Sequence, residues 1–301
     1  PDTEVVATMG AKDALAHLVL ATITPGDVVF APSPTYPIHP YSVVIAGGDL
    51  RHIPIRPDSD FFEDLKAAAR LTWPLPKMLI ISFPHNPTTM VVDQDFFRKI
   101  VDFALEYKIM IIHDFAYTDL TFDGYKAPSF LAVPGAKEVG VELNSLSKPF
   151  NMTGWRIGMA CGNADLVKGI ATVKANTDSG IFNAIQYAGI EALDHGDACT
   201  EQMLRIYAGR RERLITALRD LGWTFTPPPA TFYVWVPVPD GYTSASFCDY
   251  LLDTCAIVLA PGAAYGTHGE GWVRFSLTVP DDRLDQAIAR MRERLTPFRF
   301  S

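Results

Sequence analysis

The chain has 301 residues, 48% of them hydrophobic and 20% charged, and this length exceeds what one hydrophobic core usually serves, which predicts two domains. The formal net charge of -8 includes no basic block, no apolar run could cross a bilayer and no leader opens the chain, so we expect a soluble, cytoplasmic protein without a nucleic-acid or membrane partner. Four sparse cysteines without a CxxC pair argue against a disulfide scaffold and a zinc site, and we expect no bound metal.

Strands and helices alternate along the first part of the chain. Apolar residues recur at helical spacing over residues 11–23, where Pro25-Gly26-Asp27 ends the helix, and a second clear helix covers residues 93–107. The apolar runs expected to form strands are residues 28–31, 50–55, 78–83, 109–114, 139–143 and 157–161. This alternation predicts a largely parallel sheet covered by helices on both faces, with ligands beyond the carboxyl ends of the strands.

The pattern changes in the last third of the chain. A long helical stretch over residues 181–221 ends at Gly222, and Pro227-Pro228-Pro229 follows. Beyond it we expect helices at 244–253 and 281–295 and strands at 232–238, 257–260 and 272–277. We place the domain boundary near residue 205, inside the helical stretch. The predicted fold class is α/β, with a large three-layer α/β/α domain over residues 1–205 and a smaller α+β domain over residues 206–301.

A lysine lies in the most informative stretch, Ser145-Leu146-Ser147-Lys148-Pro149-Phe150-Asn151-Met152-Thr153-Gly154-Trp155-Arg156. A lone loop lysine is usually a solvated surface charge. Here Ser145, Ser147 and Arg156 supply hydroxyl donors and a bidentate cation, which together suit a phosphate. Neighbouring cations and partial desolvation would lower the proton affinity of Lys148 and help it form an imine near neutral pH. The spacing Ser145-x-x-Lys148 also occurs in penicillin-recognising enzymes, but the Ser-Asp-Asn and Lys-Thr-Gly motifs required there are absent from the sequence.

A second informative stretch is Ile111-Ile112-His113-Asp114-Phe115-Ala116-Tyr117, where an apolar run ends in an acid and a phenol follows. By itself this pattern is compatible with Asp114 capping a turn and Tyr117 packing. Beside a cofactor lysine, the Asp114 carboxylate would keep a pyridine ring protonated and make it an electron sink. Tyr117 would then hydrogen-bond the phenolic oxygen of that ring. His113 either holds the Asp114 carboxylate or is a structural histidine.

Other positions carry weaker signals, each with a structural alternative. Asn86 follows a predicted strand and would face the same sheet edge, although Asn86-Pro87 is first of all a turn signal. Ala11 and Lys12 open a helix whose free N–H groups favour an anion, as many helix starts do without a ligand. Tyr36, in the proline-rich loop 32–40, would either stack on a flat cofactor or pack structurally. Arg274 interrupts an apolar strand and needs an acidic partner, either a substrate carboxylate or an internal salt bridge.

Together and in this order, these residues resemble the class I/II aminotransferases of fold-type I, which use pyridoxal 5'-phosphate. The resemblance covers essentially the whole chain and implies the three-layer pyridoxal-phosphate-dependent transferase fold. Ser145-x-x-Lys148 with Arg156, Asp114-x-x-Tyr117, Asn86-Pro87 and the late Arg274 are jointly very specific. The stretches around Asp114 and Lys148 look closest to the branch that contains alanine (glutamate–pyruvate) aminotransferase and LL-diaminopimelate aminotransferase.

The resemblance implies a role for each of these residues. Lys148 would be the Schiff-base lysine and the proton shuttle, and Asp114 would pair with the pyridine nitrogen. Tyr117 and Asn86 would contact the O3′ oxygen of the ring. Arg274 would bind the substrate α-carboxylate, with Asn86 beside it. The remaining cofactor contacts would be Tyr36, stacked on the ring, and a phosphate cup of Ala11, Lys12, Ser145, Ser147 and Arg156.

The implied reaction moves an amino group from an L-amino acid to a 2-oxo acid by a ping-pong mechanism. On resemblance alone we expect alanine, 2-oxoglutarate and a homodimer. Two alternatives stay open, namely a β-eliminating lyase, which shares the cofactor residues, and an aminotransferase-like ligand-sensing domain of a transcription regulator. The sequence departs from the family where Thr89 replaces the usual glycine after Asn-Pro-Thr, and we expect that the family's N-terminal segment is missing from this chain.

Overall fold

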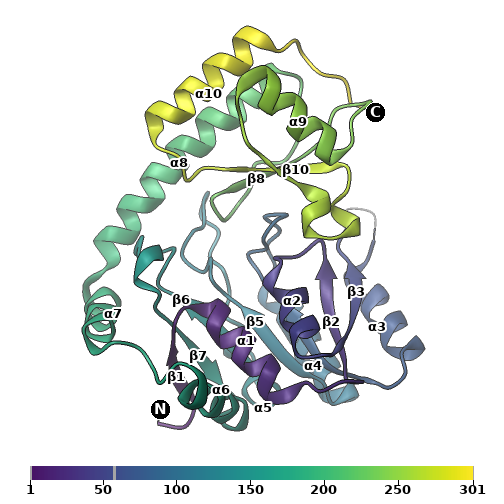
Figure 1. The fold of residues 1–301 in the computed structure, drawn as a ribbon, viewed down its shortest axis with the longest axis vertical. Coiled ribbons are helices and arrows are strands. Elements are labelled where there is room, and N and C mark those ends of the chain that lie inside the picture. Colours follow the sequence, from purple (N-terminus) through teal and green to yellow (C-terminus); the bar gives the residue numbers. More distant parts are fainter. Residues whose placement is uncertain (1, 57–58, 301) are drawn as a thin grey trace.

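A seven-stranded sheet organises the larger part of the molecule (Figure 1). The computed structural model describes residues 2–56 and 59–300. The strand order is β1-β7-β6-β5-β4-β2-β3, in which the pairs from β6 to β3 are parallel, whereas β7 is antiparallel to β6 and β1 to β7. The largely parallel sheet predicted from the sequence is confirmed. Its strands are β1 (Val5–Thr8), β2 (Val28–Ser33), β3 (Asp49–Pro54), β4 (Pro76–Ile81), β5 (Met110–Asp114), β6 (Gly140–Ser145) and β7 (Gly158–Gly162).

Helices cover both faces of this sheet, and each face has its own apolar core. The inner strand β4 is apolar on both sides, because Leu79 packs into one core and Ile80 into the other. Leu15 of α1 lies in the core with Ile80, and Phe97 of α4 lies in the core with Leu79. The first face carries α1 (Ala11–Thr22), α2 (Ile38–Ile45) and α6 (Ala164–Thr177), and the second carries α3 (Phe61–Leu71), α4 (Gln94–Tyr107) and α5 (Ala136–Val139).

Local sequence determines where α4 begins and ends. The side chain of Asp93 accepts a hydrogen bond from the Phe96 N–H at 2.9 Å, which caps the first turn and contributes about 1 kcal/mol. Apolar side chains at helical spacing, Phe97, Ile100 and Ala104 among them, then face the core. Lys108 adopts a left-handed conformation and ends the helix. The prediction of a helix over residues 93–107 is confirmed.

Three sequence predictions need correction. The helical stretch over 181–221 is two helices, α7 (Asn183–His195) and α8 (Asp197–Asp220), which meet at Gly196, where a Cβ atom would lie 2.5 Å from the Phe150 ring. The proline-rich loop 32–40 is shorter than expected because β2 reaches Ser33 and α2 begins at Ile38, with Pro40 in a first turn that needs no proline N–H. The strand at 257–260 is reduced to β9 (Ala260–Pro261), and β1 was not predicted.

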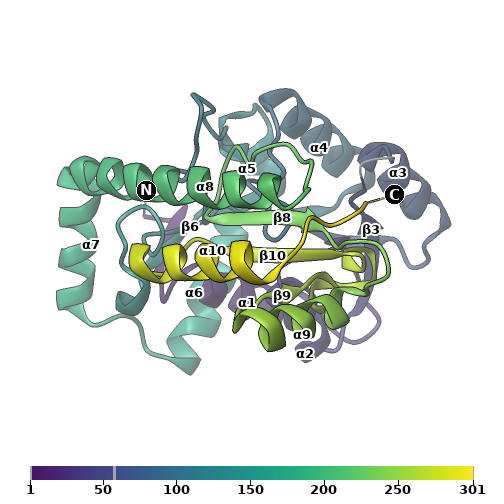
Figure 2. The same ribbon diagram turned by 90° about the horizontal axis from the view of Figure 1, so that it is seen from above.

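A smaller antiparallel sheet, in the order β8-β10-β9, lies above the large sheet with three helices over it (Figures 1 and 2). Its core contains Trp223, Phe247 and Leu251, together with apolar side chains of α8. Residue 205 falls inside α8, a single helix of 24 residues, so the domain boundary stays a prediction. None of the described helices could span a membrane. The remaining elements are β8 (Tyr233–Pro237), β10 (Trp272–Ser276), α9 (Ser244–Cys255), α10 (Asp281–Arg294) and the 3-10 turns η1 (Phe130–Ala132), η2 (Thr153–Trp155), η3 (Gly262–Tyr265) and η4 (Thr267–Gly269).

The turn after β4 contains a strained residue, which gives a test of the fold. Thr89 has a φ of 61°, a left-handed conformation that costs a residue with a Cβ about 1–2 kcal/mol. We expect Thr89→Gly to raise the free energy of unfolding by about 0.5–1 kcal/mol in denaturant titrations, because glycine relieves the strain but loses more chain entropy on folding. The bond from the Thr89 N–H to the His85 carbonyl, at 2.9 Å, is compatible with glycine.

Thr88→Gly is the matched control for this substitution. The Thr88 hydroxyl contacts His85 Nδ1 at 2.7 Å, so removing it should destabilise the same turn. Equal stability of Thr89→Gly and the unmodified protein would contradict the assignment of strain to Thr89.

Candidate active site

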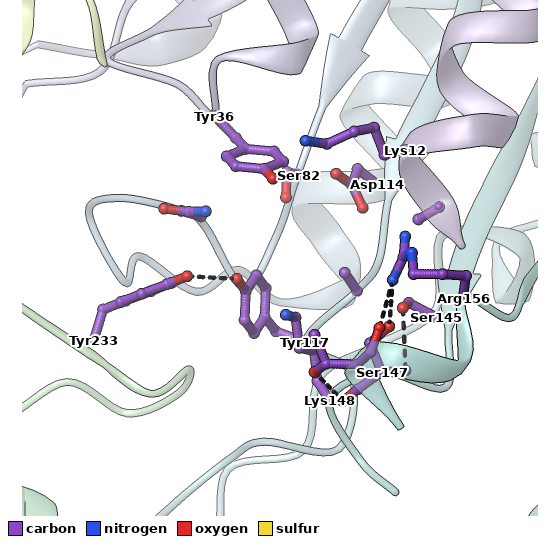
Figure 3. A pocket seen from close by; sticks show the side chains of 14 residues that line it. Lys12, Tyr36, Ser82, Asp114, Tyr117, Ser145, Ser147, Lys148, Arg156 and Tyr233 are labelled. Carbon is purple, nitrogen blue, oxygen red and sulfur yellow. Dashed lines mark hydrogen bonds between the residues drawn. The ribbon is translucent and has the colours of Figure 1, made fainter. Parts of the chain in front are cut away.

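A cavity of about 470 Å³ opens at the carboxyl ends of β4, β5 and β6, beneath the small sheet (Figure 3). Every residue that the sequence assigns to the cofactor lines it. Arg274 lies next to the cavity, where its Nη1 donates to Asn86 Oδ1 at 2.6 Å. The lining residues are Ala11, Lys12, Tyr36, Ser82, Asn86, Asp114, Ala116, Tyr117, Ser145, Ser147, Lys148, Thr153, Arg156 and Tyr233.

One end of the cavity is built for an anion. Arg156 Nη1 donates to the Ser147 hydroxyl at 3.3 Å and to the Thr153 carbonyl at 2.9 Å, while Nη2 donates to the Met9 carbonyl at 3.1 Å. The guanidinium therefore joins the loop after β6 to the start of α1, whose unpaired N–H groups and dipole favour negative charge. Gly10 is required there, because its φ is 87° and a Cβ would lie 2.6 Å from Arg156.

Lys148 follows β6 and is mostly enclosed by protein. Burial and, after it, the positive charge of Arg156 lower the pKa of the Lys148 amine. The Nζ atom lies 5.2 Å from the centre of the Phe232 ring. A lysine in this setting loses its proton more easily than a surface lysine, and its neutral amine is a nucleophile.

Asp114 ends β5 with one carboxylate oxygen paired and the other unpaired. Oδ2 lies 3.0 Å from His39 Nε2, and His39 Nδ1 lies 2.8 Å from the Thr35 hydroxyl, so a Thr35 donor places the histidine N–H toward Asp114. Oδ1 is buried without a hydrogen-bond partner among the described residues. A buried acceptor of this kind requires a donor. A protonated ring nitrogen in the cavity would supply one, so this site fits the pyridine ring of pyridoxal phosphate.

His39 was not predicted from the sequence, and the role of His113 was left open. His113 Nδ1 lies 3.3 Å from Glu142 Oε2 and its Nε2 lies 3.1 Å from the Phe83 carbonyl, so it is a structural histidine that does not hold Asp114. His39 lies three residues after Tyr36, and its ring centre is 5.9 Å from that of Tyr36, which lines the cavity. Only recognition of the helix at Ile38–Ile45 would have pointed to it.

Aromatic and amide side chains complete the cavity wall. Tyr36 lies on the wall with Lys12 Nζ 5.4 Å from its ring centre. The Tyr117 hydroxyl donates to the Tyr233 hydroxyl at 3.1 Å, and burial raises the pKa of Tyr117 well above its ordinary value. Ser82, Ala116, Thr153 and Tyr233 also line the cavity, although the sequence analysis assigned none of them to the site.

The partly buried Lys148, the Asp114 carboxylate with one unpaired oxygen, and an anion cradle formed by Arg156, Ser147 and the start of α1 surround one cavity on a three-layer α/β/α fold and fit pyridoxal phosphate. The chain belongs to the aminotransferases of class I and II, since the model of that family matches residues 1–291. It is therefore an aminotransferase that uses pyridoxal 5'-phosphate, and the predicted fold class, enzyme class and cofactor are confirmed.

Known relatives extend over nearly the whole chain. An LL-diaminopimelate aminotransferase from Moorella thermoacetica is 44% identical over 300 residues, which cover 100% of this chain and 77% of the relative, and one from Halothermothrix orenii is 44% identical over 97% and 75%. Among solved structures, substrate-bound BacF from Bacillus subtilis is 34% identical with a TM-score of 0.92, covering 100% and 77%. An aromatic aminotransferase from Pyrococcus horikoshii is 28% identical with a TM-score of 0.91, covering 97% and 79%.

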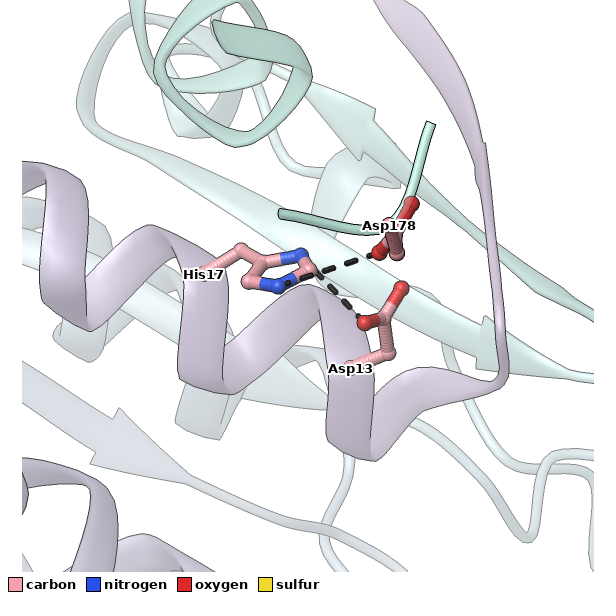
Figure 4. Close-up of side chains that lie close together, drawn as sticks. All are labelled: Asp13, His17 and Asp178. Atoms are coloured by element: carbon pink, nitrogen blue, oxygen red, sulfur yellow. Dashed lines mark ion pairs between the residues drawn. The ribbon is translucent and has the colours of Figure 1, made fainter. Parts of the chain in front are cut away.

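A cluster of Asp13, His17 and Asp178 lies outside the cavity (Figure 4), with one potential ligand atom from each within 4.8 Å of the others. The Lys174 ammonium supplies the positive charge that a metal ion would otherwise provide, because it lies 3.1 Å from Asp13 Oδ2 and 3.0 Å from Asp178 Oδ1. Asp13 Oδ2 also accepts the Met9 N–H at 2.9 Å. The Met9 carbonyl in turn accepts a hydrogen bond from Arg156, so this cluster helps to position the guanidinium that faces the anion.

The pairing of His39 with Asp114 predicts the effect of two substitutions. His39→Leu leaves Asp114 Oδ2 without its donor, which costs about 1–3 kcal/mol and frees the carboxylate to turn from the cavity. We expect the Kd for pyridoxal phosphate to rise about tenfold when cofactor-free protein is titrated and followed by visible absorbance. His39→Gln keeps an N–H donor and should recover part of the affinity. Unchanged affinity of His39→Leu would contradict this role.

The lowered pKa of Lys148 predicts a pH-dependent stability. Because the folded-state pKa lies below the ordinary value of 10.5, the unfolded chain binds more protons between the two values, and stability rises with pH in that window. At neutral pH, burial of the Lys148 ammonium lowers the free energy of unfolding, and Lys148→Met removes this destabilisation. We expect cofactor-free Lys148→Met to be more stable than the unmodified protein at pH 7 in urea titrations, with the difference shrinking toward pH 10.5.

Lys168→Met, at an exposed position of α6, controls for the loss of a surface charge. A stability difference for Lys148→Met that stays constant with pH would show that the ammonium is not destabilised by folding.

Proposed function

We propose that Lys148, Asp114 and Arg156 are the cofactor-binding core of this aminotransferase, with Lys148 the lysine that carries pyridoxal phosphate. The observation that supports this most directly is their convergence on one cavity, with the Lys148 amine, the unpaired Asp114 oxygen and the anion cradle all lining it. In this proposal Ala11, Lys12, Ser145 and Ser147 complete the phosphate site. Tyr36 covers the ring, and Tyr117 and Asn86 lie at its edge.

The proposed reaction assigns one task to each side chain. Bound pyridoxal phosphate supplies an electron sink that stabilises negative charge at the substrate α-carbon. Asp114 keeps the sink effective by accepting the ring N–H. The neutral Lys148 amine accepts the substrate α-proton and later returns a proton, which its lowered pKa favours. A second half-reaction with a 2-oxo acid runs the same proton transfers in reverse.

Arg274 is proposed to bind the substrate α-carboxylate, with Asn86 beside it. Its guanidinium carbon lies 3.8 Å from the centre of the Tyr233 ring and 4.9 Å from that of Tyr265. Over residues 2–56 and 59–300, no carboxylate lies within ion-pair distance of Arg274, and its Nε is buried without a hydrogen-bond partner. An enclosed cation without a counter-ion favours an external carboxylate over the internal salt bridge considered from the sequence.

The substrate is proposed from the relatives, because the solved structures of this fold carry several different substrate names. Since the relatives at 44% identity are named LL-diaminopimelate aminotransferases, we propose LL-diaminopimelate as the amino donor and a 2-oxo acid, 2-oxoglutarate first, as the acceptor. Alanine, expected from the sequence, is the alternative donor.

We also propose that the protein is a cytoplasmic homodimer. Exposed apolar side chains on and beside α7, such as Phe182, Tyr187 and Ile190, support a subunit interface there. A measurement of the molecular mass in solution would distinguish a dimer from a monomer.

The experiment that tests the function is a visible spectrum of protein loaded with pyridoxal phosphate, compared with Lys148→Ala and with Lys168→Ala as control. We expect a visible cofactor band that only Lys148→Ala lacks. LL-diaminopimelate should bleach the band and 2-oxoglutarate should restore it, whereas bleaching by alanine alone would select the alternative donor.

Other outcomes separate the remaining hypotheses. A band of equal strength in Lys148→Ala would contradict the role of Lys148. Release of ammonia, a 2-oxo acid and a thiol from a cysteine conjugate, whose β-carbon carries a thiolate leaving group, would indicate β-elimination. A band that no amino acid moves would indicate ligand sensing.

A further inference from the structure

Tyr233 lies between the two halves of the proposed site. It is buried on β8 of the small sheet and lines the cavity (Figure 3). Its hydroxyl is 3.1 Å from the Tyr117 hydroxyl, and its ring centre is 3.8 Å from the Arg274 guanidinium carbon. One side chain therefore touches the residue proposed at the cofactor ring and the residue proposed to bind the substrate.

The hydrogens of the two phenols limit how this pair can work. Each hydroxyl has one hydrogen to donate, and in the structure Tyr117 donates to Tyr233. If Tyr117 donates instead to the O3′ oxygen of the cofactor, its own oxygen is left only as an acceptor toward Tyr233. The bond between the phenols then reverses, and Tyr233 becomes its donor. A phenol that accepts a hydrogen bond becomes a stronger donor, so Tyr233 strengthens the bond from Tyr117 to O3′.

The ring of Tyr233 has a separate effect on Arg274. The guanidinium lies between the Tyr233 and Tyr265 rings, and a cation over a desolvated aromatic face is held by the charge distribution of the ring. With Asn86 at its Nη1, this contact fixes the direction in which the free edge of the guanidinium points. The position of Arg274 thus depends on the ring and not on the hydroxyl.

We propose that Tyr233 is a positioning residue for transamination, whose hydroxyl strengthens the Tyr117 hydrogen bond to the cofactor and whose ring orients Arg274 for the substrate carboxylate. This inference rests on the proposed function, in which Tyr117 contacts O3′ and Arg274 binds the α-carboxylate. The two effects can be tested separately, because the effect on Tyr117 depends on the Tyr233 hydroxyl and the effect on Arg274 depends on the Tyr233 ring.

The first test is a pH titration of the visible cofactor band in Tyr233→Phe. A donor to O3′ withdraws electron density from the oxygen and makes the adjacent ionisable group of the bound cofactor release its proton more readily. Weakening that donor should therefore move the midpoint of the titration to higher pH. Tyr207→Phe, which removes another buried hydroxyl next to Phe232, is the matched control and should leave the midpoint unchanged.

The double variant Tyr117→Phe/Tyr233→Phe shows whether Tyr233 acts through Tyr117. Tyr117→Phe alone should shift the midpoint further than Tyr233→Phe, and adding Tyr233→Phe should then change nothing more. Additive shifts would mean that Tyr233 acts on the cofactor by another path, which would overturn the coupling.

The second test measures binding of propionate, a carboxylate without an amine, by calorimetry on the loaded protein. Tyr233→Phe keeps the ring and should bind propionate as the unmodified protein does, while Tyr233→Leu should bind it roughly three- to tenfold more weakly. Equal affinity of all three proteins would overturn the role of the ring. A midpoint that Tyr233→Phe leaves in place would overturn the role of the hydroxyl. If no Lys148-dependent band forms at all, the proposed function itself is contradicted, and this outcome is distinct from a failure of the role assigned to Tyr233.

Discussion

The burial of the Asp114 carboxylate is the constraint around which the site is organised. It ends the central strand β5, beneath the small sheet, where an unpaired charge would cost several kcal/mol. His39 stabilises one oxygen, and the other faces the cavity without a donor among residues 2–56 and 59–300. The helix α2 that carries His39 follows β2, two positions from β5 in the sheet. The fold therefore presents a carboxylate that only a ligand can satisfy fully.

The sequence predicted the residues whose position follows from a strand end. Asn86 and Lys148 follow β4 and β6, and Asp114 ends β5. Because parallel strands bring their carboxyl ends to one edge, the convergence of these residues could be derived from the order of elements. His39 and Tyr233 could not be derived in this way. Their bonds to Asp114 and Tyr117 join residues 75 and 116 positions apart, and neither periodicity nor turn chemistry contains that information.

The errors in the predicted elements have the same origin in tertiary contacts. The helical pattern runs through Gly196 without interruption, and the pattern does not contain the contact with the Phe150 ring, 46 positions earlier in the chain, which packs where a Cβ atom of residue 196 would lie. The edge strand β1 is short and partly exposed, so its four residues show no buried pattern that would distinguish it from a loop. Local sequence determines α4, with its cap and apolar face, far better than it determines the break between α7 and α8 or the edge strand β1.

In the proposed mechanism, the chemical tasks and the selective tasks are divided between the two sheets. Strand ends and a helix start of the large domain hold the lysine, the carboxylate and the anion cradle, to which the proposal assigns cofactor binding and proton transfer. Strands β8 and β10 supply Tyr233 and Arg274, which are proposed to position and bind the substrate carboxylate. Direct bonds at the cavity join the two sides at Asn86–Arg274 and Tyr117–Tyr233. Under this proposal, a change of substrate can act on the small sheet while the groups that transfer protons stay in place, which is consistent with one architecture shared by relatives named for different amino acids.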